Sequence, residues 1–314
     1  MSRRDFQDTR QLLPDDAAAA AGGAGGAGGA GGAVVDRAIG QILADLRQLT
    51  PDQVDKVLQH QRAKGLRFGE AAVELGLVEN DDVLVALSRQ FHYPYAPKEQ
   101  RQDSPDLVAL NEPFSYRAET FRALRSQLLQ RLWGKPVARD QRRALAVISA
   151  DIGDGKTYCV SNLAVAMAQL GGHTLLVDAD LRNPRAHEVF HVDNSRGLSG
   201  ILSGRAEKNI IQPAAGIAGL YVLPSGVAPP NPLELVERPA FGMLLAELTA
   251  KFDHVLVDSP AAAHGADAGV IAARCGAALV VARRNASRVG ALQDLVGSLN
   301  DATVQVAGVV MNEW

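Results

Sequence analysis

From residue 144 onward, short apolar runs alternate with segments of helical pattern. The runs are rich in Val, Leu, Ile and Ala, and they cover residues 145–149, 174–177, 220–223, 254–257, 277–282 and 304–311. Nearly continuous apolar strands separated by helices are typical of a parallel sheet covered on both faces. The pattern therefore predicts an α/β fold built on a doubly wound, mostly parallel sheet.

The pattern before residue 98 is different. Residues 17–33 are only Ala and Gly, so they bury too little side chain to offset their ordering entropy, and we expect 1–33 to be a disordered leader. Residues 34–97 are amphipathic, and Thr50-Pro51-Asp52-Gln53 and Glu79-Asn80-Asp81-Asp82 have the acidic character of helix starts. We predict a small helical domain over 34–97, a linker over 98–113 and the main domain over 114–314.

A weak internal repeat runs through the predicted helical domain. Its members lie 29 residues apart, and they are Ile39-Gly40 and Phe68-Gly69, the two helix starts, Val54 and Val83, Leu58 and Leu87, and Gln61 and Gln90. Self-similarity at a fixed period indicates two related units.

Composition and charge narrow the classes of function. A net charge of −3 with 47% hydrophobic residues provides no basic excess for nucleic acid, so we expect no nucleic-acid partner. The two cysteines, Cys159 and Cys275, are too few for a disulfide framework and fit a reducing cytoplasm. The chain has no apolar stretch of 18 or more residues and no signal core, so we expect membrane contact only through a partner.

A phosphate-binding loop follows the first strand of the main domain. Ala150-Asp151-Ile152-Gly153-Asp154-Gly155-Lys156-Thr157 is a Walker A motif between a strand and a helix, with Ala150 in place of the first glycine. The glycines let backbone amides turn toward phosphate oxygens, Lys156 would meet the β- and γ-phosphates, and Thr157 would bind Mg²⁺. The alternative is a structural glycine turn that precedes a helix.

Two later strands end in carboxylates. Asp178 and Asp180 follow the strand at 174–177, and Asp258 follows the strand at 254–257. Ligands of such sheets bind at the carboxyl ends of the strands, so Asp258 is a candidate Mg²⁺ ligand of Walker B type. Each aspartate alone could instead cap a turn, but three acids in order after a Walker A loop favour an ATP site.

At these residues the chain resembles the bacterial tyrosine kinases that accompany polysaccharide chain-length determinants, in particular the exopolysaccharide-operon (EpsG-type) branch. The resemblance covers residues 115–314 and includes Asp178-Ala179-Asp180-Leu181-Arg182-Asn183-Pro184-Arg185-Ala186-His187, which is similar to the family's second Walker motif. It implies ATP and Mg²⁺ as cofactors. The implied catalytic residues are Lys156, Asp178 and Asp180; the nucleotide contacts are Gly153, Asp154, Gly155, Lys156, Thr157, Tyr158 and Asn312; the metal ligands are Thr157, Asp178 and Asp258.

A helix near residue 119 also resembles a family feature. Glu119, Arg122 and Arg125 match the Glu-x-x-Arg-x-x-Arg helix that packs neighbouring subunits into rings, which implies a homo-oligomer. The spacing alone favours a solvated helix face with internal ion pairs.

The tyrosines depart from the family pattern. Family kinases carry a tyrosine cluster on a C-terminal tail, whereas this chain ends at Trp314 directly after the last predicted strand, and we expect no phosphorylated tail. Tyr158 and Tyr221 fall in a helix and a strand, so Tyr93, Tyr95 and Tyr116 are the candidate acceptors, with ordinary packing as the alternative for each.

The helical domain is similar to the N-terminal domain of type II secretion and pilus assembly ATPases, some of which bind cyclic di-GMP. The matching positions are Arg67-Phe68-Gly69, Gly76, Leu77, Val83, Leu87 and Gln90. The upstream copy has Ala38 and Arg47 where the motif has Arg and Gly, which removes one expected ligand contact. The alternative is a helical docking module whose repeated apolar positions form a core.

Together these features predict an ATP-dependent protein tyrosine kinase that regulates exopolysaccharide chain length and export. The resemblance implies a cytoplasmic protein, peripheral to the inner membrane through a membrane-embedded chain-length determinant. Two alternatives remain: a switch ATPase of the partitioning type, which usually has a lysine where this chain has Asp151, and a cyclic di-GMP-responsive assembly adaptor.

Overall fold

A computed structural model describes residues 39–90, 104–134 and 142–313. These residues fall into two compact units, and we call residues 39–90 the helical domain and the described residues from 104 onward the main domain. The predicted leader at 1–33, the first residues of the predicted helical domain, and both Tyr93 and Tyr95 lie outside the described residues.

The helical domain consists of four helices in two consecutive units, α2 (Ile39–Arg47) followed by α3 (Pro51–Lys64), and α4 (Phe68–Glu74) followed by α5 (Asn80–Gln90). The units pack crosswise, α2 against α5 and α3 against α4. Thr50 caps α3 as expected, because its hydroxyl accepts the Gln53 N–H while the Gln53 side chain accepts the Thr50 N–H. The helix starts repeat with the 29-residue spacing of the sequence, and so do three pairs of core residues, Ile42 and Ala71, Leu43 and Ala72, and Val57 and Ala86.

The main domain is built on a seven-stranded sheet with the order β3-β4-β2-β5-β1-β6-β7. The strands are β1 (Ala144–Ser149), β2 (Thr174–Asp178), β3 (Gln212–Pro213), β4 (Leu220–Leu223), β5 (His254–Asp258), β6 (Gly276–Arg283) and β7 (Gln305–Asn312). All pairs are parallel except β3 with β4. The doubly wound, mostly parallel fold is thus confirmed, and each of the six predicted strands is present to within one residue at either end.

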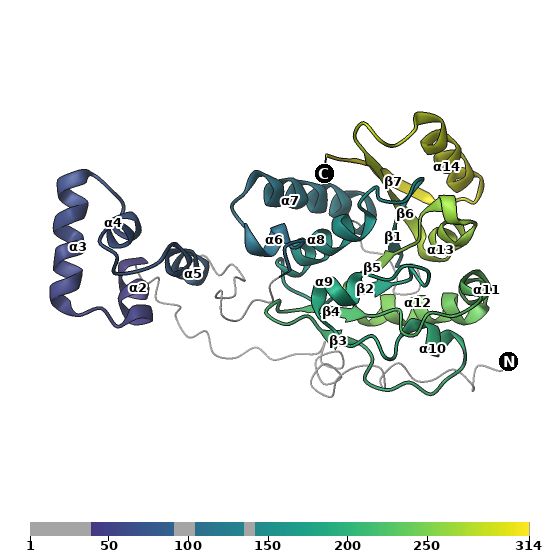
Figure 1. Cartoon of the computed structure of the whole chain (residues 1–314), viewed down its shortest axis with the longest axis horizontal. Coiled ribbons are helices and arrows are strands. Elements are labelled where there is room, and N and C mark those ends of the chain that lie inside the picture. The colour runs from purple at the N-terminus through teal and green to yellow at the C-terminus, as the bar shows by residue number, and fades with distance from the viewer. Residues whose placement is uncertain (1–38, 91–103, 135–141, 314) are drawn as a thin grey trace. The chain divides into compact units, whose positions relative to one another are not determined.

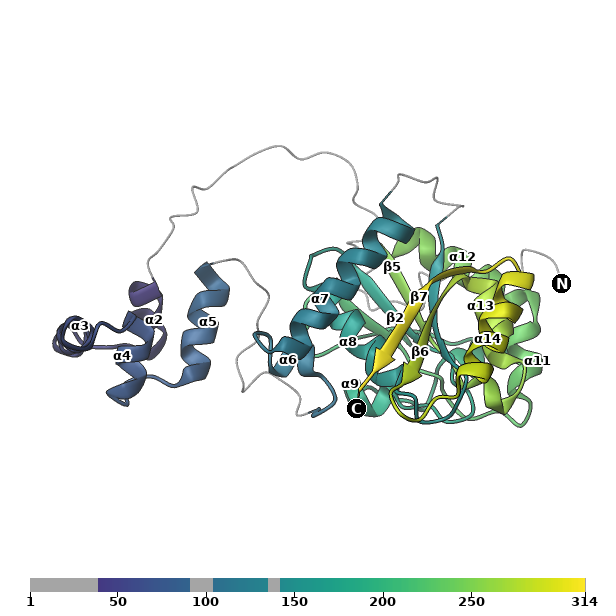
Figure 2. The ribbon, with the colours of Figure 1, turned by 90° about the horizontal axis from the view of Figure 1, so that it is seen from above.

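Helices cover both faces of this sheet, as Figures 1 and 2 show. One side carries α6 (Val108–Asn111), α7 (Tyr116–Leu128), which continues as the π-helical turn η4 (Leu129–Trp133), and α8 (Lys156–Ala168). The other side carries α11 (Pro232–Glu237), α12 (Pro239–Lys251), α13 (Asp267–Cys275) and α14 (Val289–Asp301). Two short helices, α9 (Ala186–Phe190) and α10 (Leu198–Leu202), and the 3-10 turn η6 (Ala262–His264) complete the described elements.

Part of the predicted linker at 98–113 packs as main domain. Leu107, Val108, Ala109 and Leu110 are buried, and Asn162 of α8 accepts the Ala109 N–H and donates to the Asp106 carbonyl. The prediction of a linker rested on the charged residues of this stretch and overlooked these four apolar residues, which pack against α8.

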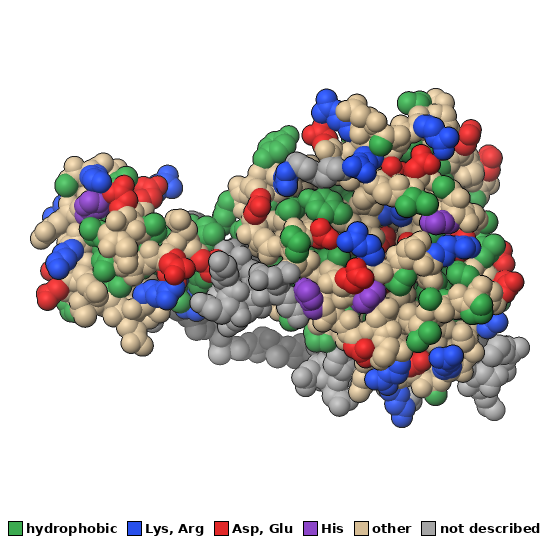
Figure 3. All heavy atoms as spheres, in the orientation of Figure 1, with side chains coloured by type: hydrophobic (Ala, Val, Ile, Leu, Met, Phe, Trp, Pro, Cys, Tyr) green, Lys and Arg blue, Asp and Glu red, His purple; other side chains and the backbone are tan. Residues whose placement is uncertain are grey.

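The surface agrees with the low net charge. On the face drawn in Figure 3, Lys and Arg side chains are interspersed with Asp and Glu. No helix among the described residues has the length and apolar character needed to cross a membrane.

Candidate functional site

The phosphate-binding loop lies at the carboxyl edge of the sheet, between the end of β1 and the start of α8. Gly153 and Gly155 have positive φ values of 82° and 91°, which glycine adopts without steric cost. Gly155 is the N-cap of α8, so the free N–H groups of the first helical turn face the loop. The strand-loop-helix context that the motif requires is therefore present.

Lys156 is buried, with only 8% of its surface exposed. Its ammonium group donates to the Ser149 hydroxyl at 3.0 Å, and that hydroxyl donates to the Asp151 carbonyl. Lys156 is therefore not a surface charge of the loop, because its side chain turns inward to Ser149 at the end of β1.

Three of the predicted acidic and hydroxyl residues converge beside the loop. Asp178 of β2 and Asp258 of β5 are register partners on neighbouring parallel strands, and both are fully buried. The Thr157 hydroxyl donates to Asp258 Oδ2 at 2.6 Å. Parallel pairing brings these residues together because strands of the same direction end at the same edge.

Burial and the charge of a neighbouring acid raise the pKa values of both aspartates. Burial and the nearby Asp258 charge raise the pKa of Asp178 well above its ordinary value. Burial raises the pKa of Asp258 to about 6, against the Thr157 hydrogen bond and the Lys156 charge, which lower it. A site with this much uncompensated negative charge favours binding of a cation.

The two acids of the β2 end differ in their hydrogen bonds. Asp178 accepts the Asp180 N–H on one oxygen and the Ala186 N–H on the other. Asp180 accepts both of its backbone N–H bonds, from Arg182 and Asn183, on Oδ1. Its Oδ2 receives no hydrogen bond from the residues that the structure describes, so this oxygen is the one available to a substrate.

An ion pair that the sequence did not reveal holds the same turn. Arg182 donates two hydrogen bonds to the Asp267 carboxylate, at 3.1 and 3.0 Å, and Asp267 is 2% exposed. Bidentate pairs of this kind fix geometry as well as charge. The contact anchors the turn after β2 to the start of α13.

Asn312 at the end of β7 also reaches the loop. Its amide donates to the Asp154 carbonyl at 2.9 Å, and a Cβ at position 155 would lie 2.1 Å from the Asn312 amide nitrogen. The predicted contact of Asn312 with the nucleotide stays a prediction, whereas the structure shows its hydrogen bond to the loop.

Replacement of Gly155 by alanine should therefore displace the loop. We expect Gly155→Ala to weaken binding of a fluorescent ATP analogue at least about tenfold, because a Cβ strains the positive φ and collides with Asn312. Gly290→Ala is the matched control, since nothing lies within 4 Å of a Cβ there. Equal affinity of the two variants, measured by fluorescence titration, would contradict this role of Gly155.

The connection between β6 and α14 contributes residues that sequence reasoning missed. The Ser287 hydroxyl donates to Asp154 Oδ1 at 2.7 Å, Arg288 donates to Asp151 Oδ1 at 3.2 Å, and Arg283 donates to the Gly153 carbonyl at 3.4 Å. These residues directly follow the carboxyl end of a predicted strand, and that position could have identified them as candidate site residues. They hold the outer side of the phosphate loop.

Tyr158 packs against α7. Its ring meets Phe121 edge to face at 5.9 Å between centroids, and burial raises the pKa of its hydroxyl. The two rings line a cavity of about 380 Å³ with Asn312 and the end of β7. Tyr158 therefore lies beside the loop, on the side of Asn312.

The charged residues of α7 make contacts within their own chain. Arg122 pairs with Glu119 and donates to the Pro113 carbonyl, and Arg125 donates to the Ala166 carbonyl of α8 at 2.7 Å. The Glu119 side chain is 67% exposed. Internal ion pairing, which the spacing favoured, is present, and a role between subunits stays a prediction.

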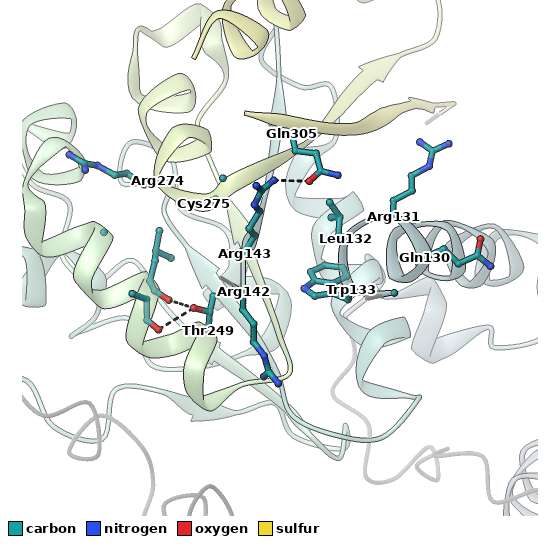
Figure 4. A pocket seen from close by; sticks show the side chains of 16 residues that line it. Gln130, Arg131, Leu132, Trp133, Arg142, Arg143, Thr249, Arg274, Cys275 and Gln305 are labelled. Atoms are coloured by element: carbon teal, nitrogen blue, oxygen red, sulfur yellow. Dashed lines mark hydrogen bonds between the residues drawn. The ribbon is translucent and has the colours of Figure 1, made fainter. Parts of the chain in front are cut away.

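Another cavity of the main domain lies at the opposite edge of the sheet. It has a volume of about 690 Å³ and is lined by residues at the starts of β1, β6 and β7, among them Ala144, Gly276 and Gln305. Figure 4 shows Arg143 near its centre, bonded to Gln305, with Arg131 and Arg274 on opposite sides. Since the phosphate loop lies at the carboxyl edge, this cavity is separate from the candidate site.

The donor atoms at the carboxyl edge fit a magnesium ion that also binds phosphate. Mg²⁺ takes one or two carboxylates and fills its other positions with water and phosphate oxygens. Thr157 and Asp258 are within 2.6 Å of each other, with Asp178 on the next strand. Among the described residues no group of three His, Cys, Asp or Glu side chains is arranged to hold a metal ion.

Comparisons with known proteins agree with this geometry. The family described as the CobQ/CobB/MinD/ParA nucleotide binding domain matches residues 145–314. The tyrosine-protein kinase wzc of Salmonella typhi is 30% identical over 213 residues, which are 68% of this chain and 29% of that protein. The tyrosine-protein kinase etk of Escherichia coli K12 is 32% identical over 205 residues, which are 65% of this chain and 28% of that protein.

Solved structures also match the main domain to bacterial tyrosine kinases. The kinase domain of the Escherichia coli tyrosine kinase ETK superposes with a TM-score of 0.61 at 32% identity, and the match covers 68% of this chain and 83% of that domain. The chain thus spans less than a third of the length of these curated relatives but most of the solved kinase domain. The chain belongs to the CobQ/CobB/MinD/ParA nucleotide-binding family, and its homologues are bacterial tyrosine kinases.

Proposed function

We propose that this protein is an ATP-dependent protein tyrosine kinase that works with Mg²⁺. The observation that carries the proposal is the convergence of Lys156 and Thr157 with two strand-end acids, Asp178 and Asp258, on one edge of the sheet. Phosphoryl transfer needs mainly positioning and charge neutralisation, which such a site supplies. The kinase names of the relatives support the choice of tyrosine as acceptor.

In the proposed mechanism the loop amides and Lys156 would hold the β- and γ-phosphates, and Thr157, Asp178 and Asp258 would hold Mg²⁺, which would supply neutralisation of phosphate charge. A tyrosine hydroxyl attacks the γ-phosphorus in line. Asp180 receives the phenolic proton, because its Oδ2 is the oxygen left without a backbone partner among the described residues. Asp178, with both oxygens engaged, would position the turn and the metal.

We further propose that the kinase regulates exopolysaccharide chain length and export at the inner membrane, through a membrane-embedded chain-length determinant. Homo-oligomers would form through the face of α7 that carries Glu119, since that carboxylate is exposed. These proposals rest on the kinship with Wzc, Etk and EpsB kinases. Membrane association that persists without any partner protein would contradict them.

For the helical domain the packing favours a docking module over a ligand site. A Cβ at Gly69 would lie 2.9 Å from Val83, so this motif glycine has a packing role between α4 and α5. Arg67, by contrast, is exposed. Calorimetric titration with cyclic di-GMP decides the question, because a ligand site predicts binding that disappears in Arg67→Ala.

The proposed function is tested by ATP-dependent phosphotyrosine formation in the purified chain, detected by immunoblot and mass spectrometry. We expect Asp180→Asn to reduce the signal at least about 100-fold, since it removes the proton acceptor. Asp301→Asn, an exposed carboxyl at the end of α14, is the control. ATP turnover without phosphotyrosine would instead identify a switch ATPase of the partitioning type.

A further inference from the structure

The tyrosines of the described residues differ sharply in access. Tyr221 of β4 is half-buried and stacks on His173 at 5.8 Å and against Phe252 at 5.6 Å. Tyr158 is half-buried against Phe121. Tyr116 is 88% exposed. Of these three hydroxyls, only that of Tyr116 can enter another protein's active site without unfolding part of the main domain.

Tyr116 is presented by a rigid element. It is the first residue of α7, directly after the N-cap Ser115, whose hydroxyl accepts the Ala118 N–H at 3.1 Å. Ala118 and Leu128 are buried, and Arg125 ties the helix to α8. The neighbouring Phe114 is 62% exposed, so the start of α7 offers two adjacent aromatic rings to solvent.

The sheet order separates Tyr116 from the acids of its own chain. Tyr116 lines the 380 Å³ cavity with Val310, Met311 and Asn312 of β7, whereas Asp178 ends β2. In the order β2-β5-β1-β6-β7 these strands are four steps apart, which corresponds to about 19 Å at the usual strand spacing. Tyr116 thus lies over the β7 side of the sheet and is 88% exposed, so a second copy can bring its own acids to this hydroxyl without moving α7.

We propose that Tyr116 is a phosphoacceptor of this kinase and that a second copy of the chain phosphorylates it. The inference rests on the proposed kinase function and names its substrate. The Tyr116 oxygen forms a bond to the γ-phosphorus of ATP held by the partner copy. The bond from that phosphorus to the β,γ-bridging oxygen breaks, ADP leaves with the electron pair, and the phenolic proton passes to Asp180 of the partner copy.

The product is compatible with the helix that carries it. A phosphate on the first residue of α7 lies beside a helix N-terminus, where negative charge is favourable. The residue is also one turn from Glu119, so that modification adds charge to the helix face proposed to join subunits. The same fold therefore accommodates the modified and unmodified side chain.

The acceptor is tested by incubating the full chain with ATP and Mg²⁺ and mapping phosphotyrosine by mass spectrometry. We expect most of the label on Tyr116 and at least about a tenfold loss in Tyr116→Phe, which keeps the ring. Tyr221→Phe, the matched control, should keep the label. Full labelling of Tyr116→Phe, for example at Tyr93 or Tyr95, would overturn the inference and leave the kinase proposal intact. No phosphotyrosine in the unmodified sequence would overturn both.

The transfer between copies is tested by mixing two variants of different mass. Lys156→Ala keeps Tyr116 but lacks the phosphate-binding lysine, and Tyr116→Phe keeps the nucleotide site but lacks the acceptor. We expect label on Tyr116 of the Lys156→Ala chain only when both variants are present. An unlabelled Lys156→Ala chain in a mixture whose Tyr116→Phe partner phosphorylates a synthetic tyrosine peptide would overturn transfer between copies.

Discussion

Replacement of Lys156 by alanine is expected to lower ATP turnover at least about 100-fold, because it removes the cation that we propose meets the β- and γ-phosphates. The change also leaves Ser149 without its ammonium donor and removes a charge that lowers the pKa of Asp258. The nucleotide-free variant should therefore lose about 1–2 kcal/mol of stability. Steady-state hydrolysis and thermal unfolding measure the two effects.

A lysine outside the main domain provides the control. Lys64 is an exposed residue that pairs with Glu74 in the helical domain, so Lys64→Ala should leave turnover unchanged. Hydrolysis by Lys156→Ala at the rate of the unmodified protein would show that the phosphate loop has been assigned wrongly.

Replacement of Asp258 by asparagine is expected to make the nucleotide-free protein more stable while abolishing turnover. The carboxyl is fully buried and its pKa is raised to about 6. At neutral pH the ionised carboxylate therefore lowers the free energy of unfolding by about 3 kcal/mol. Asparagine removes the charge and can still accept the Ser259 N–H, but its amide would have to donate to the Thr157 hydroxyl, which now donates to the carboxylate. We expect a net gain of about 1–2 kcal/mol, or a Tm higher by about 3–6 °C.

The pH dependence follows from the direction of the shift. A carboxyl whose pKa is higher in the folded state binds its proton more tightly there. Its protonated form stabilises the fold at low pH, and this contribution is lost as pH rises from about 4 toward 6. The Tm advantage of Asp258→Asn should therefore shrink as pH is lowered from 7 to 5.

Nucleotide should reverse the order of stability. With Mg²⁺ and ATP the unmodified protein should gain stability by mass action, whereas Asp258→Asn, which lacks a proposed metal ligand, should gain little. Asp294→Asn, in an exposed part of α14, is the control for the loss of one surface charge. A lower Tm for Asp258→Asn than for the unmodified protein, both without ligand, would contradict the inference that the buried Asp258 carboxylate destabilises the nucleotide-free fold.

Much of the site was predictable because its signals are local. The Walker A loop, its flanking strand and helix, and the aspartates at the ends of β2 and β5 are each contained within about ten residues of sequence. Parallel sheets place such strand ends on one edge, so the meeting of Asp178 and Asp258 followed from the pattern. The 29-residue repeat likewise predicted two related units in the helical domain, and α2 and α4 begin 29 residues apart.

Other features depended on contacts between distant segments. Ser287 and Arg288 form hydrogen bonds with phosphate-loop residues that lie more than 130 residues earlier in the chain. No spacing pattern in the sequence indicates these contacts. The burial of Leu107 and Leu110 within the predicted linker depends on α8, which follows later in the chain. Because polar and charged residues surround Leu107 and Leu110 in the sequence, the pattern did not indicate that these two side chains pack in the main domain.

Local patterning of apolar residues, glycines and strand-end acids thus settled the fold class and the residue types of the phosphate site, since backbone conformation and strand direction respond to near neighbours. The burial, pKa values and accessibility of individual groups depended on tertiary packing. Packing buried Lys156 and raised the pKa values of Asp178 and Asp258. It left one oxygen of Asp180 without a backbone hydrogen bond among the described residues and the side chain of Tyr116 exposed to solvent. Desolvation and access depend on which segments cover a group, and only the folded chain decides that.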